Sequence, residues 1–180
     1  MSTEKRVTFQ PATAVDIPEV VALMNAAYRG IGGAPGWTHE IGVVDGTRTD
    51  ASTLATMMAS PTGLILLMHD AADLALLGCV YLEPTSDAAV WHLAMLTVDP
   101  RRQTGGLGRR LLAGAEAHAK AAGAKQVNMT VVWLRDSLIA WYERRGYRRT
   151  GTTEPFPYDD ASVGTPLRDD LHFIVLEKDV

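Results

Sequence analysis

Apolar residues recur along this chain with two different spacings, and each change of spacing marks the boundary of a predicted element. Short apolar runs bounded by Gly, Pro, Asp or Ser are typical of buried strands. They predict strands over 7–10, 63–68, 74–82, 90–98, 126–133, 147–150 and 171–177. Apolar positions three and four residues apart predict helices over 17–29, 52–59 and 107–122, the first of them starting at a capping box of Asp16 and Glu19. The stretches 30–50 and 152–170, rich in Gly, Thr, Pro and Asp, are predicted to be loops.

The segment 93–112, LAMLTVDPRRQTGGLGRRLL, points most directly to a function. A predicted strand ends at Asp99-Pro100, a glycine-rich turn follows, and a helical pattern begins. The first N–H groups of a helix have no internal partner and carry partial positive charge. Glycines allow the backbone to approach a phosphate closely. The segment therefore predicts an anion site at the start of a helix.

Two familiar phosphate-binding loops do not fit this segment. An ATP-binding Walker loop needs Lys and Ser or Thr after its last glycine, but two arginines follow Gly108. A dinucleotide-binding loop would have a third glycine where Leu111 stands. The pattern that does fit is Q-x-x-G-x-G, at Gln103, Gly106 and Gly108.

A second motif, WYERRGY, occupies residues 141–147. A short helix would carry Tyr142, and Gly146 is well placed as the residue that ends it. Together with the glycine-rich loop, this motif resembles the GNAT family of N-acetyltransferases. That family's pyrophosphate loop reads R/Q-x-x-G-x-G/A, and its cofactor-binding core ends in roughly Tyr-Glu-x-x-Gly-Phe. The family often has Asn seven residues before that Tyr, where this chain has Arg135.

The resemblance covers roughly residues 7–178 and implies a fold. The expected class is α/β (α+β), with a mixed central sheet of about seven strands and helices on both faces. The sheet would be splayed in its middle to admit acetyl-CoA. A chain of 180 residues is long enough for one well-packed domain, so we expect a single domain over residues 1–180.

The resemblance also implies a binding site for acetyl-CoA as co-substrate. The backbone of Leu96 to Val98 would hold its pantetheine arm, and the N–H groups of about Gly105 to Arg110 would hold its pyrophosphate. Nearby arginines, including Arg101 and Arg102, would either add charge or form a solvated helix start. The candidate cofactor-binding residues are Leu96, Thr97, Val98, Gln103, Thr104, Gly105, Gly106, Leu107, Gly108, Arg109, Arg110 and Arg135.

Tyr142 is the candidate general acid, because the family places a Tyr at this position to protonate the leaving thiolate. A phenol is protonated at neutral pH and can donate to such a group. Without the resemblance, a Tyr beside Trp141 on a short helix would be assigned to core packing.

The general base has three candidates. His92 starts one predicted strand, and histidine titrates closest to neutral pH. Glu83 ends the preceding strand, nearer to where the family often keeps a carboxylate. Glu40, in the predicted loop, is a third option. The alternatives are a strand histidine paired with a backbone group and a solvent-facing glutamate, and some enzymes of the family have no single assignable base.

Composition narrows the partners. The formal net charge is −4 and no basic tract is present, so we expect no nucleic acid or membrane partner. Cys79 is the single cysteine, so no disulfide can form within the chain and we expect a cytoplasmic protein. No histidine or cysteine spacing suggests a metal site, and we expect none. Homodimerisation is common in the family and is expected here only on that ground.

The acceptor is expected to be a primary amine of a small molecule, which attacks the thioester directly in a ternary complex. Acidic residues in the loop 152–170 would favour a cationic amine, or would form an acidic surface loop. One alternative is acetylation of a protein N-terminus or lysine. Another, of a different class, is a non-catalytic domain that binds acyl-CoA as a sensor.

Overall fold

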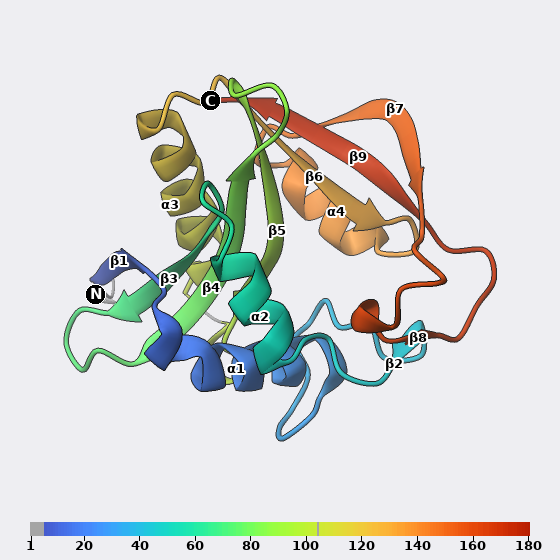
Figure 1. Ribbon diagram of the computed structural model, residues 1–180, viewed down its shortest axis with the longest axis horizontal. Helices are drawn as coiled ribbons and strands as arrows, with labels where there is room; N and C mark the ends of the chain where they lie inside the picture. Colours follow the sequence, from blue (N-terminus) through green and yellow to red (C-terminus); the bar gives the residue numbers. More distant parts are fainter. Residues whose placement is uncertain (1–5, 104) are drawn as a thin grey trace.

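The computed structural model describes residues 6–103 and 105–180, and its centre is a seven-stranded mixed sheet (Figure 1). Neighbouring strands pair antiparallel except β5 and β6, which pair in parallel. The expected seven-stranded mixed sheet is confirmed. In spatial order its strands are β1 (Val7–Pro11), β3 (Leu64–Asp70), β4 (Leu76–Pro84), β5 (Val90–Val98), β6 (Gln126–Val132), β9 (His172–Asp179) and β7 (Arg148–Pro155).

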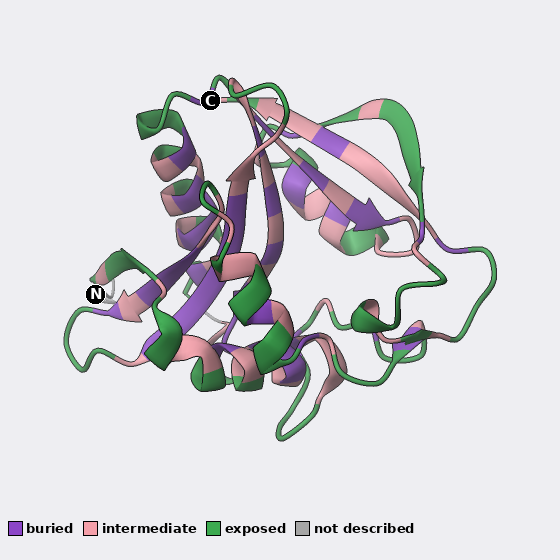
Figure 2. Cartoon of the chain, in the orientation of Figure 1, coloured by how far each residue is buried: buried purple, intermediate pink, exposed green. Residues whose placement is uncertain are grey.

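Helices cover both faces of the sheet, and each face has its own apolar cluster. The helices are α1 (Ile17–Arg29), α2 (Ala51–Met58), α3 (Leu107–Ala121) and α4 (Asp136–Glu143). The apolar sides of α3 and α4 pack into one cluster with Leu77 and Met129. Those of α1 and α2 pack into the other with Ile65 and Cys79. Figure 2 shows the buried residues concentrated along the inner sides of these helices and the central strands.

The remaining segments contain short elements that the sequence pattern did not predict. β2 (Val44–Asp45) and β8 (Thr165–Pro166) pair as a separate two-stranded sheet inside the two predicted loops. Short 3-10 helices are η1 (Ala14–Asp16), η2 (Pro100–Arg102) and η3 (Ala161–Val163). β7 runs to Pro155, beyond the predicted end at 150, because an exposed edge strand buries no face and so has no apolar periodicity.

The predicted capping box at the start of α1 is wrong. The carboxylate of Asp16 accepts hydrogen bonds from the backbone N–H and the hydroxyl of Thr13, at 2.7 and 2.9 Å. The capping box belongs to the 3-10 turn η1, which precedes α1: Thr13 is the cap of that turn and Asp16 is its third residue. Asp16 directly precedes α1, but its side chain makes no capping hydrogen bond to that helix.

β5 and β6 pair over only three residues and then separate. The last pair is His92 with Asn128, after which the two strands diverge, as Figure 1 shows. A β-bulge follows immediately in β5. Tyr81 of β4 pairs with Ala94 and Cys79 pairs with Thr97, so β5 has one more residue between the two pairs than β4 has. Met95 sits in the bulge with φ of 58°, in the left-handed region. Bulges bend the strand that carries them, so this one accounts for the divergence.

Candidate functional site

Three adjoining cavities, together called the trough, run from the start of α3 into the gap between β5 and β6. The outer cavity, of about 100 Å³, lies at the first turn of α3. The middle cavity, of about 60 Å³, shares Trp37, Val98 and Gln103 with it, among others. The inner cavity, of about 130 Å³, is lined by the diverging strands and shares Tyr28 and Tyr142 with the middle one.

The outer cavity has the features of an anion site. Gly105 and Gly106 take φ of 79° and 74°, and among the described residues no side chain caps the first N–H groups of α3. Arg109 and Arg145 also line the cavity. Free N–H groups, a helix N-terminus and two guanidinium groups together favour a phosphate-bearing ligand.

Aromatic side chains flank the outer and middle cavities. Trp37 is about half exposed on the loop after α1, and its backbone N–H donates to the side-chain oxygen of Gln103 at 3.0 Å. Trp141 on α4 stands opposite the start of α3, where a Cβ added at Gly108 would lie 3.4 Å from its ring. The guanidinium of Arg145 lies 3.6 Å from the centre of the Trp141 ring. Gly108 therefore keeps the passage between helix and indole open.

Tyr142 lies at the junction of the middle and inner cavities. It is 5% exposed, and its ring packs edge-on against Trp141 and Tyr147 at 5.0 and 5.6 Å between centres. Its hydroxyl makes no hydrogen bond within residues 6–103 and 105–180. Burial raises the pKa of the Tyr142 phenol, the nearby phenol of Tyr28 adds to the rise, and Arg135 and Arg145 partly oppose it. The phenol is therefore protonated at neutral pH.

A buried ion cluster forms one wall of the inner cavity. Glu40 pairs with Arg29 through one carboxylate oxygen and with Arg135 through the other, the latter at 3.2 Å. Arg135 also donates to the backbone carbonyl of Thr38. Burial alone would raise the pKa of the Glu40 carboxyl, but the charges of Arg135, Arg48 and Arg29 outweigh it, and the pKa lies below its ordinary value. An ionised carboxylate held this firmly is a poor proton acceptor, so Glu40 fits a structural anchor better than a base.

The structure places the other two base candidates side by side. Glu83 on β4 and His92 on β5 are direct cross-strand partners. Glu83 accepts a hydrogen bond from the Tyr81 hydroxyl at 2.8 Å, and the His92 ring contacts the Asn128 side chain at 2.8 Å. Neither residue lines the trough, although His92 immediately precedes Leu93, where the lining of the inner cavity begins on β5.

The predicted cofactor residues divide into three groups. Those lining the trough are Leu96, Val98, Gln103, Gly106, Gly108, Arg109 and Arg135. Four others do not line it. The Thr97 hydroxyl donates to the Met95 carbonyl, Leu107 is in the core, and Gly105 and Arg110 line none of the three cavities. Thr104 lies outside the described residues.

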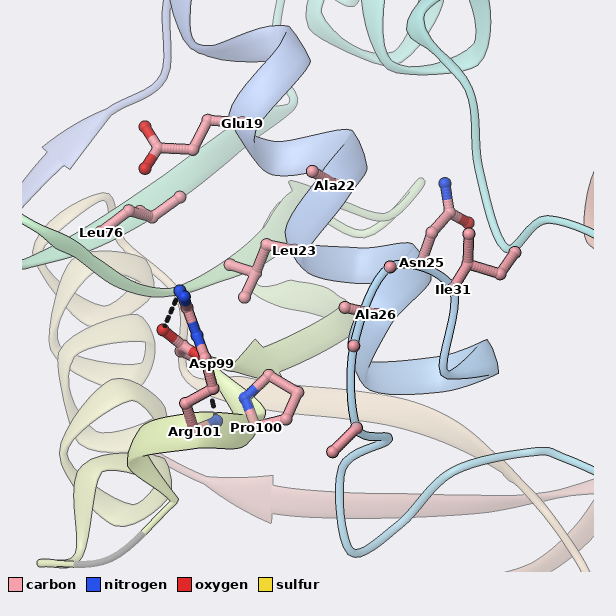
Figure 3. Close-up of a pocket in the computed structure, with 13 residues that line it drawn as sticks. Glu19, Ala22, Leu23, Asn25, Ala26, Ile31, Leu76, Asp99, Pro100 and Arg101 are labelled. Carbon is pink, nitrogen blue, oxygen red and sulfur yellow. Dashed lines mark hydrogen bonds and ion pairs between the residues drawn. The ribbon is translucent and has the colours of Figure 1, made fainter.

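Arg101 does not contribute charge to the trough. Its guanidinium makes two bonds to Asp99, at 2.9 and 3.0 Å, and Arg102 lies 3.9 Å from the same carboxylate. Figure 3 shows this pair at a separate cavity of about 430 Å³, with Leu23 of α1 opposite. That cavity shares no lining residue with the three cavities of the trough.

Several lining residues were missed by the sequence reasoning, notably Tyr28, Arg48 and Leu138. Tyr28 and Arg48 come from segments far from the two motifs, whereas Leu138 lies on α4, three residues before the second motif. Among the described residues, no group of three or more His, Cys, Asp or Glu side chains could hold a metal ion. Likewise, none of the described helices is long and apolar enough to cross a membrane.

Comparisons with known proteins agree with this geometry. The sequence model of the acetyltransferase (GNAT) domain matches residues 62–149. Over 91 residues the chain is 34% identical to an amino-acid acetyltransferase of Azotobacter vinelandii. The aligned segment covers 51% of this chain and 20% of that protein. The chain thus spans about a fifth of the length of the curated relatives it matches.

Solved structures of low sequence identity share the fold. The PaiA N-acetyltransferase from Thermoplasma acidophilum, in complex with coenzyme A, aligns with a TM-score of 0.70 at 16% identity, covering 97% of this chain and 99% of that one. A ribosomal-protein-alanine N-acetyltransferase from Brucella melitensis aligns with a TM-score of 0.67 at 18% identity, covering 96% and 99%. At these identities the likeness establishes the fold alone.

Proposed function

We propose that this chain, in which residues 62–149 match the acetyltransferase (GNAT) domain model, is a GNAT enzyme that catalyses acetyl-CoA-dependent N-acetylation of an amine. The observation that carries the proposal is the trough, because it joins an anion site at the start of α3 to a buried tyrosine between two diverging strands. These are the two ends that a long phosphate-bearing thioester would need.

The residues present fit acetyl-CoA. The free N–H groups at the start of α3 and the guanidinium groups of Arg109 and Arg145 would hold its phosphates. Leu96 and Val98 would border its pantetheine arm, with Trp37 and Trp141 on the flanks. When bound, acetyl-CoA supplies an activated acetyl thioester.

Tyr142 is proposed as the general acid. Its phenol is protonated at neutral pH and has no competing hydrogen bond among the described residues. The pKa of a phenol lies above that of a thiol, so full proton transfer is uphill until charge develops on the sulfur. A phenol in this position therefore acts first as a hydrogen-bond donor to the departing thiolate.

Glu83 and His92 remain the proposed base candidates. An alkyl amine must lose a proton before it attacks, and these two polar residues are cross-strand neighbours just before the inner cavity. Because neither lines that cavity, either would act through a water. Separate Glu83→Gln and His92→Gln variants test the role. The true base is expected to show a rate defect that shrinks as the pH rises.

The inner cavity favours a small acceptor. Its volume is about 130 Å³, and its lining includes Glu40 and Arg135 of the ion cluster as well as Phe173. A protein N-terminus or lysine is the alternative. The names of relatives cover both classes, since one is an amino-acid acetyltransferase and another acetylates a ribosomal protein.

The test is acetyl-CoA-dependent thiol release against a panel of amines, with acetyl-CoA affinity measured by calorimetry. Tyr142→Phe is expected to keep that affinity and to lower kcat by about 10²-fold or more. Tyr147→Phe is the matched control, since it removes a buried hydroxyl that bonds Glu116 and lines none of the three cavities. Unchanged kcat in Tyr142→Phe would remove its role. Affinity for acetyl-CoA with no thiol release from any amine would favour the non-catalytic sensor.

A further inference from the structure

We propose that the acceptor carries a carboxylate in addition to its amine, and that the guanidinium of Arg48 binds it. The inference rests on the proposed function and names the class of its acceptor: small amino acids and related amino acids with a free carboxylate. Three independent features of the inner cavity carry it.

The first feature is the position of Arg48. It precedes α2, is half-buried, and lines the inner cavity. Its guanidinium lies 5.2 Å from the centre of the Tyr28 ring, and Arg135 lies 5.6 Å from the centre of the same ring. Its backbone N–H donates to Asn25 at 2.6 Å, which holds the main chain beside α1. The side chain is therefore held at the cavity from a fixed backbone.

The second feature is that Arg48 has no anionic partner in contact. Among residues 6–103 and 105–180, its guanidinium makes no hydrogen bond and no ion pair within 4.0 Å. Glu40 acts on it only at longer range, because both of its carboxylate oxygens are already bonded to Arg29 and Arg135. A half-buried guanidinium with unused donors is a strong site for a carboxylate, which can accept two parallel hydrogen bonds from it.

The third feature is the sign of the charge around the inner cavity. The charged side chains that line it are Glu40, Arg48 and Arg135, so its lining carries an excess of positive charge. Of the two readings given for the acidic residues in the loop 152–170, the charge of the lining favours the acidic surface loop over a site for a cationic acceptor. Asp170 instead pairs with Arg168 at 2.7 Å, Asp160 accepts from the Ser162 backbone, and neither lines the trough.

The size of the cavity agrees with an amino-acid acceptor. Its volume of about 130 Å³ is well above the roughly 10–15 Å³ that a cavity needs to hold one water molecule. That is room for the amine, the central carbon and the carboxylate, with a side chain leaving through the opening. A protonated polyamine would instead meet two guanidinium groups and one carboxylate that is already saturated.

The experiment compares amino acids with their amides, which keep nearly the same shape but lack the negative charge of the carboxylate. For the wild-type protein, kcat/KM from thiol release is expected to be about 10- to 100-fold higher for the acid than for its amide. Glycine, β-alanine and 4-aminobutanoate then separate an α-carboxylate from a more distant one. Binding of the same compounds to the protein with coenzyme A, followed by calorimetry, gives a readout that does not depend on turnover.

Arg48→Gln is expected to remove that preference. Its kcat/KM should fall about 10- to 100-fold for the acid and stay within about threefold for the amide, while Arg48→Lys recovers part of the loss. Acetyl-CoA affinity should not change. Arg144→Gln is the matched control. Arg144 directly follows α4, is exposed, and lines none of the three cavities.

Two results would overturn the inference. One is a wild-type protein that uses amides or plain amines as well as acids, in which case the proposed acetyltransferase function stands and the carboxylate site falls. The other is an Arg48→Gln variant that loses acid and amide activity equally. Absence of acetyl-CoA binding would overturn the proposed function together with the inference. The wild-type comparison remains decisive even if the variant folds poorly.

Discussion

Replacing Glu40 by Gln tests whether the ion cluster behind the inner cavity holds the fold together. The substitution keeps the shape of the side chain and removes its charge. Arg29 and Arg135, whose side chains are only 3% and 13% exposed, would lose their shared anion. Removing one partner of a buried pair typically costs 3–5 kcal/mol, because the remaining charge stays buried without compensation.

The expected loss of unfolding free energy is about 3 kcal/mol, at the low end of that range. The amide oxygen can still accept one hydrogen bond, and the guanidinium groups keep their bonds to the carbonyl oxygens of Thr38 and Val163. For a chain of this length, such a loss corresponds to a fall in Tm on the order of 10 °C. Urea unfolding, followed by circular dichroism, measures it directly.

The pH dependence of the same experiment has a definite sign. The pKa of Glu40 is lowered on folding from its ordinary 4.5, so its contribution to stability is present above pH 4.5 and is lost as the pH falls through the folded value. The gap between wild type and Glu40→Gln should therefore be constant near neutrality and narrow in acid. Glu154→Gln, at an exposed position of β7, is the control and should stay within about 0.5 kcal/mol of wild type. A Glu40→Gln loss below about 1 kcal/mol at pH 7 would refute the reasoning.

Three further outcomes are expected. Gly78→Ala would put a Cβ 2.5 Å from a backbone carbonyl oxygen of β5, and it should lower the unfolding free energy measured in urea by about 1–3 kcal/mol. Gly33→Ala, where a Cβ would meet nothing within 4 Å, should leave that free energy unchanged. Equal effects of the two substitutions would contradict the packing argument. Arg109→Gln should weaken acetyl-CoA binding about fivefold by calorimetry, while Arg101→Gln should leave it unchanged, and the reverse order would remove Arg109 from the phosphate site. Burial raises the pKa of the Cys79 thiol to about 12, so Cys79 should react with a disulfide reagent at pH 8 only after unfolding; rapid reaction in the native protein would contradict its burial.

The parts of the site that are contiguous in sequence could be predicted from sequence. The loop around Gly106 lies between a strand and a helix that both have clear apolar periodicity, so its position at a helix N-terminus followed directly. The short helix carrying Tyr142 was predictable because Gly146 marks its end. In both cases the chemistry depends on neighbours within about ten residues.

The parts built from distant segments could not be predicted. Glu40 meets Arg29 and Arg135, which lie 11 and 95 residues away in the chain, and nothing in the local pattern pairs them. For Arg101 the sequence left two readings open, and its ion pair with Asp99, two residues earlier in the chain, favours the solvated helix start. The bulge at Met95 has no sequence signal, since residues with positive φ are most often Gly or Asn.

That bulge also decides which chemistry faces the trough. Side chains of a strand alternate between its two faces, but Ala94 and Met95 both pack into the cluster of α1 and α2. Leu96 and Val98 therefore pack against the cluster of α3 and α4, while Thr97 lies opposite Cys79. If the same residues continued in regular alternation without the bulge, Leu96 and Val98 would turn toward α1, and the hydroxyl of Thr97 would face the trough. The apolar side chains at these two positions thus depend on the bulge and not on composition alone. A family member of the same composition that paired these strands without a bulge would present a hydroxyl there.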